Sequence, residues 1–274
     1  MLSNDWERKL SKIAALGANA PREERPARQY FLNAPFDQIE LRETAQLIAQ
    51  ADSAAPFRYV VTPNADHVVR LNQEPSLKPV YDEAWLALCD SKPICMFART
   101  QSRQLAHVTG SDLTVELFRS VIRPGDRIAL IVGSQSVADE VAAAFPDVHF
   151  QVHVPPMGLL TNMVAQQECI AFSLKAKARF LFLAVGAPQS ELVAYQLSRN
   201  ADAQGIGLCI GASLEFLTGK KQRAPKWVQR LGLEWLHRMS TEPGRLWRRY
   251  LVGAGPLLKL FAQEAIGRKQ PSER

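Results

Sequence analysis

Several polar side chains that could do acid–base or phosphate chemistry stand close to apolar runs of the chain. Thr62-Pro-Asn-Ala-Asp-His67 and Gly133-Ser-Gln-Ser136 each follow such a run, and Asp90 precedes one. The carboxylate of Asp90 could act as a general base, and helix amides beginning at Gly133 could hold a phosphate. Each motif also has a purely structural interpretation, since Asn64 and the serines could cap helices and Asp90 could belong to a turn.

Other common chemistries find no support in the spacing of residues. The sequence contains no GxGxxG, GxxxxGK[ST] or GxSxG pattern, which disfavours dinucleotide and ATP enzymes and serine hydrolases. Its 4 cysteines are scattered without a CxxC pair, as expected of reduced cytosolic thiols. His149 and His153 would share one face of a strand, but no acidic or cysteine partner has metal-ligand spacing. We therefore expect no metal site and no cofactor.

The elements that must position these residues alternate between strands and helices. Near-continuous apolar runs such as Phe180-Leu-Phe-Leu-Ala-Val185 are typical of strands covered on both faces. The predicted strands are residues 29–32, 59–62, 94–97, 127–132, 148–152, 180–185 and 206–210. The predicted helices are residues 39–51, 66–71, 112–122, 137–144, 162–175, 190–203 and 227–239. This alternation predicts an α/β fold with a parallel sheet and flanking helices.

The predicted fold also indicates where a site should lie. Ligands of open α/β sheets bind beyond the carboxyl ends of the strands. That edge would gather the motifs at 62–67 and 133–136 with Gly186-Ala-Pro-Gln-Ser-Glu191 and Gly211-Ala-Ser213. Asp90 precedes the predicted strand 94–97. Because Asp-Ser is common in turns, the local sequence alone favours a turn aspartate.

Charge divides the chain into a mildly acidic body and a basic tail. Residues 219–274 hold 13 Lys and Arg against 4 Asp and Glu, whereas the remaining 218 residues hold 20 against 23. We expect a polar N-terminal extension (1–28), a catalytic domain (29–218) and a basic, membrane-associating appendage (219–274). A charged N-terminus and short apolar runs predict neither a secretory signal nor a transmembrane helix.

The tail combines arginines with aromatic residues. Pro243 can start a helix in which Arg245, Arg248 and Arg249 share one face, while Trp247 and Tyr250 lie on the other. Such a helix suits a membrane interface or a phosphate site. The alternative is a surface helix with its apolar stripe in the core, but the tail holds 3 of the 5 tryptophans, which favours an interface.

In their order along the chain, these motifs resemble those of the WecG/TagA/CpsF family of bacterial glycosyltransferases. The resemblance runs from about Phe36 to Tyr250. It is carried by Thr62-Pro-Asn64, Asp90, Val108-Thr-Gly-Ser-Asp-Leu113, Gly186-Ala-Pro188 with Glu191, Arg223-Ala-Pro-Lys-Trp227, Gly232-Leu-Glu-Trp235, Arg238, and the segment from Glu242-Pro to Arg-Tyr250.

The resemblance implies a metal-independent, inverting hexosyltransferase with a Rossmann-like domain. Its donor would be a UDP-sugar: UDP-N-acetylmannosamine, its uronic acid or UDP-glucose. Its acceptor would be a polyprenyl-diphosphate-linked sugar used for cell-surface polysaccharide. The enzyme would lie at the inner face of the bacterial cytoplasmic membrane as a peripheral protein. Members of the family form oligomers, which leaves a homo-oligomer open, and nucleic acid is not an expected partner.

The resemblance also implies roles for individual residues. Asp90 matches the proposed catalytic base, and Thr62 and Asn64 match residues that line the donor pocket. The appendage arginines of the family are thought to bind phosphate. Arg238, Arg245 and Arg248 match them directly, and Arg223 lies in a neighbouring family motif. We also assign Gly133 to the donor site.

The chain departs from the family pattern around the expected sugar and nucleotide pocket. It has Ser91 after Asp90 where glycine is usual, His107 where arginine is usual, and Pro188-Gln-Ser-Glu191 where Pro-Lys-Gln-Glu is usual. We assign His107 and Gln189 to donor binding and leave the donor sugar open. Two alternatives remain at this stage: a basic-tailed nucleic-acid-binding protein, and an inactive family member that serves as an assembly partner.

Overall fold

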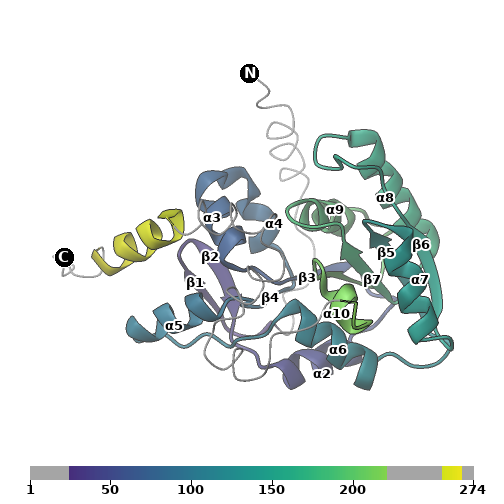
Figure 1. The fold of residues 1–274 in the computed structure, drawn as a ribbon, viewed down its shortest axis with the longest axis horizontal. Coiled ribbons are helices and arrows are strands. Elements are labelled where there is room, and N and C mark those ends of the chain that lie inside the picture. The colour runs from purple at the N-terminus through teal and green to yellow at the C-terminus, as the bar shows by residue number, and fades with distance from the viewer. Residues whose placement is uncertain (1–24, 221–254, 267–274) are drawn as a thin grey trace.

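The computed structural model describes residues 25–220 and 255–266 of the chain. The predicted helix 227–239 and the arginines Arg223, Arg238, Arg245 and Arg248 lie outside the described residues. Figure 1 shows a central sheet with helices on both sides. The predicted α/β fold with a Rossmann-like parallel sheet is therefore confirmed for the body of the chain.

Six parallel strands form the sheet in the order β4-β3-β8-β7-β5-β6. They are β3 (Arg58–Val61), β4 (Leu86–Ala87), β5 (Arg127–Val132), β6 (His149–His153), β7 (Phe180–Ala184) and β8 (Ile206–Cys209). The predictions for β3, β5, β6, β7 and β8 are confirmed to within one residue at each end. Because all the strands are parallel, their carboxyl ends meet at one edge of the sheet.

Two helical layers cover the sheet (Figure 1). One contains α2 (Leu41–Gln50), α6 (Gly110–Ser120), α7 (Gln135–Ala144) and α10 (Ser213–Leu217), and the other contains α3 (Ala65–Gln73), α4 (Lys78–Asp82), α5 (Lys92–Thr100), α8 (Met163–Ala176) and α9 (Gln189–Ser198), with the 3-10 turn η1 (Pro75–Leu77) between α3 and α4. The predicted helices in the described part of the chain correspond to α2, α3, α6, α7, α8 and α9, whereas α4 and α10 were not predicted.

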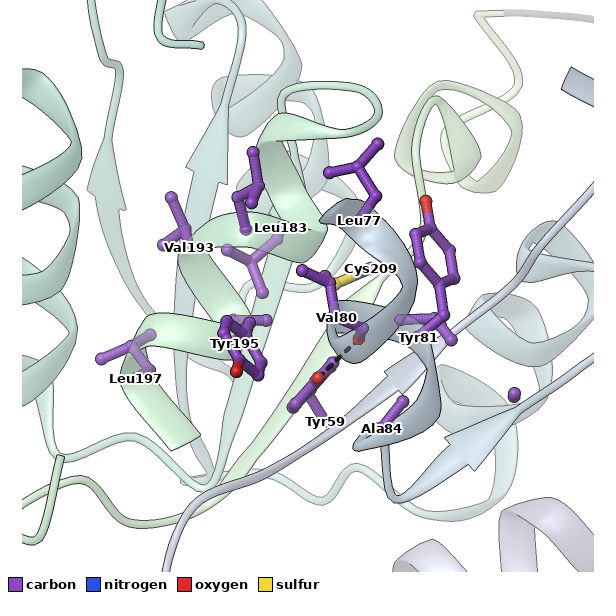
Figure 2. Packing of buried hydrophobic residues seen from close by; sticks show 14 of the residues in the cluster. Tyr59, Leu77, Val80, Tyr81, Ala84, Leu183, Val193, Tyr195, Leu197 and Cys209 are labelled. Carbon is purple, nitrogen blue, oxygen red and sulfur yellow. Dashed lines mark hydrogen bonds between the residues drawn. The ribbon is translucent and has the colours of Figure 1, made fainter. Parts of the chain in front are cut away.

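Successive side chains of each strand pack alternately against the two helical layers. On β8, Leu208 packs with the α6 side and Cys209 with the α9 side, and both are buried. Each large apolar side chain buried in this way contributes about 1.5–3 kcal/mol to folding. Figure 2 shows the α4–α9 side, where the hydroxyl of Tyr59 donates a hydrogen bond of 2.6 Å to the carbonyl of Val80. That bond ties β3 to α4.

A separate antiparallel hairpin precedes the sheet. It consists of β1 (Arg28–Phe31) and β2 (Ala34–Asp37). The prediction of a strand at 29–32 is thus confirmed, but the strand lies outside the parallel sheet. The buried carboxylate of Asp37 pairs with Arg28 at 2.7 Å and accepts a 2.7 Å hydrogen bond from the amide of Ala87. The hairpin is therefore fixed to β4.

The predicted strand 94–97 is wrong, because these residues belong to helix α5. The hydroxyl of Ser91 accepts a hydrogen bond from the amide of Ile94 at 3.4 Å and caps the helix, and Pro93 occupies its first turn. The buried residues Ile94, Cys95 and Ala98 follow the helical period. A short apolar run cannot distinguish a strand from a buried helix. The strand of this region is the two-residue β4, so Asp90 follows a strand instead of preceding one.

Residues 255–266 form a helix that packs on α5. The ring of Phe261 stacks on Phe97 with centroids 4.0 Å apart, and Glu264 lies 3.8 Å from Arg103. Part of the segment that we assigned to the appendage therefore lies against the body. None of the helices described by the structure is both long and apolar enough to cross a bilayer.

Candidate active site

The neighbouring strands β3 and β8 are followed by helices on opposite faces of the sheet. The helix after β3 is α3, which packs with the α9 side, and the helix after β8 is α10, which packs with the α6 side. Open α/β sheets bind ligands in crevices beyond the carboxyl ends of their strands, and we call the divergence between β3 and β8 the switch point. The candidate site is therefore centred where Thr62 and Gly211 leave the sheet.

Three hydroxyls converge at this switch point. Thr62 donates to the carbonyl of Cys209 at 3.2 Å, and Ser213 donates to the carbonyl of Ile210 at 2.5 Å. The hydroxyl of Ser111 lies 3.4 Å from that of Ser213. Because Thr62 and Ser213 already donate to carbonyls, their oxygens can accept hydrogen bonds from a ligand.

Gly110 makes this convergence possible. A Cβ at this position would lie 3.1 Å from the hydroxyl of Ser213 and 3.2 Å from that of Thr62. Sequence reasoning missed Ser111 and Ser213. Both stand in motifs singled out for their position after strands or in the family pattern, but neither received a role.

Asp90 lies beside this cluster at the carboxyl edge of the sheet. Its backbone amide donates to the carbonyl of Pro63 at 3.1 Å, and its Oδ2 accepts a hydrogen bond from the amide of Gly110 at 3.2 Å. Gly110 is the first residue of α6, where the helix dipole favours a negative charge. The half-buried carboxylate is thus held between the segment after β3 and the start of α6.

His107 lies next to the segment that contains Cys89 and Asp90. It forms a parallel bridge with Cys89, and the amide of Val108 donates to the carbonyl of Cys89 at 3.1 Å. The structure therefore brings the half-buried His107 next to the residue that precedes Asp90.

Asn64 and Gln189 follow β3 and β7 and belong to the same layer. Asn64 caps α3, and its side-chain oxygen accepts from the amides of Asp66 and His67. Gln189 begins α9, and its Oε1 atom is buried without a hydrogen-bond partner in the described part of the chain. An unpaired buried acceptor of this kind is costly unless something else satisfies it.

Gly133 is not brought into contact with the cluster. It is exposed after β5, and two strands, β8 and β7, separate β5 from β3. At about 4.8 Å per strand, Gly133 lies about 14 Å along the edge from Thr62. Ser134 precedes α7 and makes no side-chain cap bond there.

Burial keeps the thiols beneath the site in their neutral form. It raises the pKa of both Cys89 and Cys209 well above the ordinary value. Because a thiol reacts as its thiolate, these cysteines serve packing and not nucleophilic catalysis. No three His, Cys, Asp or Glu side chains in residues 25–220 and 255–266 are grouped to hold a metal ion.

Comparison with known proteins identifies relatives of the chain. The sequence model of the family described as glycosyl transferase WecG/TagA/CpsF matches residues 29–271. A protein of Bacillus spizizenii named N-acetylglucosaminyldiphosphoundecaprenol N-acetyl-beta-D-mannosaminyltransferase is 26% identical over 199 residues, which cover 70% of this chain and 74% of that protein.

Proposed function

The chain belongs to the WecG/TagA/CpsF family of glycosyltransferases, and we propose that it moves a sugar from a UDP-sugar to a polyprenyl-diphosphate-linked sugar with inversion. The observation that carries the proposal is the carboxylate of Asp90, held by Gly110 beside the hydroxyls at the switch point. The name of the Bacillus relative supports UDP-N-acetylmannosamine as donor and a lipid-linked N-acetylglucosamine as acceptor.

Asp90 would serve as the base of this reaction. In an inverting transfer the acceptor hydroxyl attacks the anomeric carbon as the nucleotide diphosphate leaves from the other side. The carboxylate takes the hydroxyl proton during the attack. Its Oδ2 atom is held by Gly110, which fixes the orientation of the carboxyl group.

The donor would lie along the carboxyl edge from the switch point toward β7. The oxygens of Thr62 and Ser213 can accept from sugar or ribose hydroxyls, and the unpaired Oε1 atom of Gln189 can do the same. We keep Gly133 as a candidate contact for the far end of the donor, since it lies on the same edge.

Positive charge would stabilise the nucleotide diphosphate as it leaves the donor sugar. Arg223, Arg238, Arg245 and Arg248 remain the proposed phosphate ligands of a reaction that uses no metal. Arginine suits this role because its planar fork matches phosphate oxygens.

The same edge of the sheet has features suited to a membrane. After β6 the chain runs without charge through residues 154–164. Met157 is 94% exposed and Val164 is 70% exposed. Exposed apolar side chains at the edge that holds the candidate site would let the enzyme meet a lipid-linked acceptor at the bilayer surface as a peripheral protein.

The experiment is acceptor-dependent UDP release by the purified chain. A panel of UDP-sugars would be tested with and without a short-chain polyprenyl-diphosphate-N-acetylglucosamine. We expect one donor to be consumed only with acceptor, and mass spectrometry to show the added sugar. Donor consumption that is equal without acceptor would indicate a hydrolase, and a folded protein that uses none of the donors would refute the proposal.

A further inference from the structure

A cleft of about 410 Å³ lies near the outer border of the sheet, beyond β4. It is lined by the residues that follow β2 (38–40), by Glu43 in the first turn of α2, by Arg99 in the last turn of α5, and by residues 104–106. None of these lining residues belongs to the candidate active site described above. The volume is within the range of sites that bind small molecules.

The first turn of α2 places the cleft near the carboxyl edge of the sheet. Arg179, which precedes β7 and so lies at the amino edge, donates at 3.1 Å to the carbonyl of Ala49 near the end of α2. The 10 residues of α2 span about 15 Å, which is close to the length of a strand of four residues. Because α2 ends at the amino edge and packs along α6, its first turn lies near the edge that holds Asp90 (Figure 1).

The cleft and the donor edge lie on opposite sides of the segment that contains Asp90. The amide of Asp90 donates to the carbonyl of Pro63 on the β3 side. The carbonyl of Cys89 accepts from the amide of Val108, so the segment that leads to Val108 lies on the side away from β3. Residues 104–106 belong to that segment and form one wall of the cleft.

This wall also lies within reach of the proposed base. His107 pairs in parallel with Cys89, which places Ala106 two residues short of Asp90 along the neighbouring segment. At about 3.3 Å per residue and about 4.8 Å between neighbouring segments, the Cα atoms of Ala106 and Asp90 are about 8 Å apart. One sugar ring in the cleft could therefore bring a hydroxyl to the carboxylate.

The lining suits a neutral sugar better than a phosphate. Glu40 and Glu43 contribute two carboxylates against the single guanidinium of Arg99, so an anionic group would meet net negative charge. Oε2 of Glu43 accepts from the amide of Glu40 at 3.2 Å, which holds the carboxylate and leaves Oε1 for a ligand. Sugar hydroxyls can donate to carboxylates and accept from the amide of Gln104.

Gln38 gives a second indication of a ligand. Its Nε2 atom is buried without a hydrogen-bond partner in the described part of the chain, which is costly unless something satisfies it. The last torsion of a glutamine side chain is broad, so a small turn brings this amide to a ligand in the cleft. The buried side chains of Ile39 and Leu105 give the same lining an apolar part that suits the methyl of an N-acetyl group.

We propose that this cleft binds the sugar of the lipid-linked acceptor and directs its reacting hydroxyl to Asp90. The identity of the acceptor rests on the proposed function, whereas a sugar site in the cleft does not. With the donor on the β3 side and the acceptor on the other, the hydroxyl and the leaving diphosphate lie on opposite sides of the anomeric carbon, as inversion requires. The hydroxyl oxygen bonds to that carbon as its bond to UDP breaks, and the proton passes to Asp90.

The first test measures binding and needs no donor. Amide spectra of the 15N-labelled full chain would be recorded with short-chain polyprenyl-diphosphate-N-acetylglucosamine, and with the same polyprenyl diphosphate lacking the sugar. We expect the amides of residues 38–43 and 104–106 to shift with the first probe only. Amides that do not shift, or that shift equally with both probes, would overturn the sugar site. Selective shifts without transfer of any sugar would refute the proposed function and support the site.

The second test uses steady-state kinetics. Gln38→Leu removes the unpaired amide at nearly constant volume, so the melting temperature should not fall. The KM for the acceptor should rise about fivefold, as expected for loss of one hydrogen bond, while the KM for the donor and kcat change less than twofold. Gln46→Leu is the matched control, because Gln46 is exposed on α2 and outside the cleft. Equal acceptor KM values in the two variants, with transfer intact, would place the acceptor elsewhere.

Discussion

The backbone amide of Gly110 donates a hydrogen bond to the carboxylate of Asp90. Gly110 therefore lies against both the proposed base and the hydroxyls of Thr62 and Ser213. The same residue has no side chain, so the hydroxyls of Thr62 and Ser213 can both lie where a Cβ atom would crowd them. In the proposed reaction, proton transfer and donor binding would therefore both depend on a single short segment at the start of α6.

Replacing the proposed base tests the first half of this relationship. Asp90→Asn keeps the shape of the side chain and the acceptor for the Gly110 amide, but it cannot take a proton. Transfer should fall by roughly 100-fold or more, with an unchanged melting temperature. UDP release with acceptor is the measurement, and turnover equal to that of the unmodified enzyme would remove Asp90 from the mechanism.

Adding one methyl group tests the second half. In Gly110→Ala the new Cβ would lie 3.1–3.2 Å from two hydroxyls, so Ser213 and Thr62 must move by a few tenths of an ångström. We expect the KM for the donor to rise roughly tenfold, since small misplacements at a binding site are expensive. Gly255→Ala is the control, because a Cβ there has no neighbour within 4 Å. Identical donor KM values in the two variants would mean that the cluster does not bind the donor.

The buried ion pair of the hairpin should matter for stability. Asp37→Ala leaves the Arg28 guanidinium and the Ala87 amide without their carboxylate, and should lower the free energy of unfolding by about 3 kcal/mol. Urea denaturation measures the loss. Asp52→Ala removes an exposed aspartate that accepts from the amide of Ala54, and should change stability far less. A loss at Asp37 no larger than at Asp52 would contradict the assigned role.

The stacking of Phe261 on Phe97 makes the attachment of residues 255–266 measurable. Phe97→Ala and Phe261→Ala remove the same contact, so the double variant should be more stable than the sum of the two effects predicts, by about 1 kcal/mol. Full additivity in thermal or urea unfolding would show that the helix does not rest on α5 in solution.

The exposed apolar segment after β6 gives a test for membrane contact. Met157→Asp together with Val164→Asp should reduce flotation with anionic liposomes and transfer to a long-chain acceptor, while transfer to a short, water-soluble acceptor stays the same. Met96→Asp is the control, because Met96 is 52% exposed on α5 and outside this segment. Unchanged flotation would assign membrane binding to other parts of the chain.

Sequence patterns predicted the elements that are long and buried on both faces. β5 was predicted with its observed ends because it is a continuous apolar run. α5 was mistaken for a strand because the apolar run at 94–97 is short, and β4 was missed because it has two residues. That error placed Asp90 before a strand, although its position after β4 strengthens its case as a site residue.

Side-chain partnerships were harder to predict than elements. Asn64 was weighed as a helix cap or as a site residue, and the structure shows the cap together with a histidine and a carboxylate behind it. The partners His67 and Glu191 lie 124 positions apart, and only the packing of α3 and α9 on the same face brings them together. Local spacing carries no signal for such a contact.

The hairpin also has a consequence for solubility. β4 is an edge strand, and an edge strand with free backbone groups is a template for pairing with another chain. Here the carboxylate of Asp37 accepts the hydrogen bond of the Ala87 amide, and Arg28 donates to the carbonyls of Ala84 and Trp85. Because Arg28 and Asp37 bind these backbone groups, a strand of another chain cannot pair with them. The ion pair thus protects the folded protein from edge-to-edge aggregation.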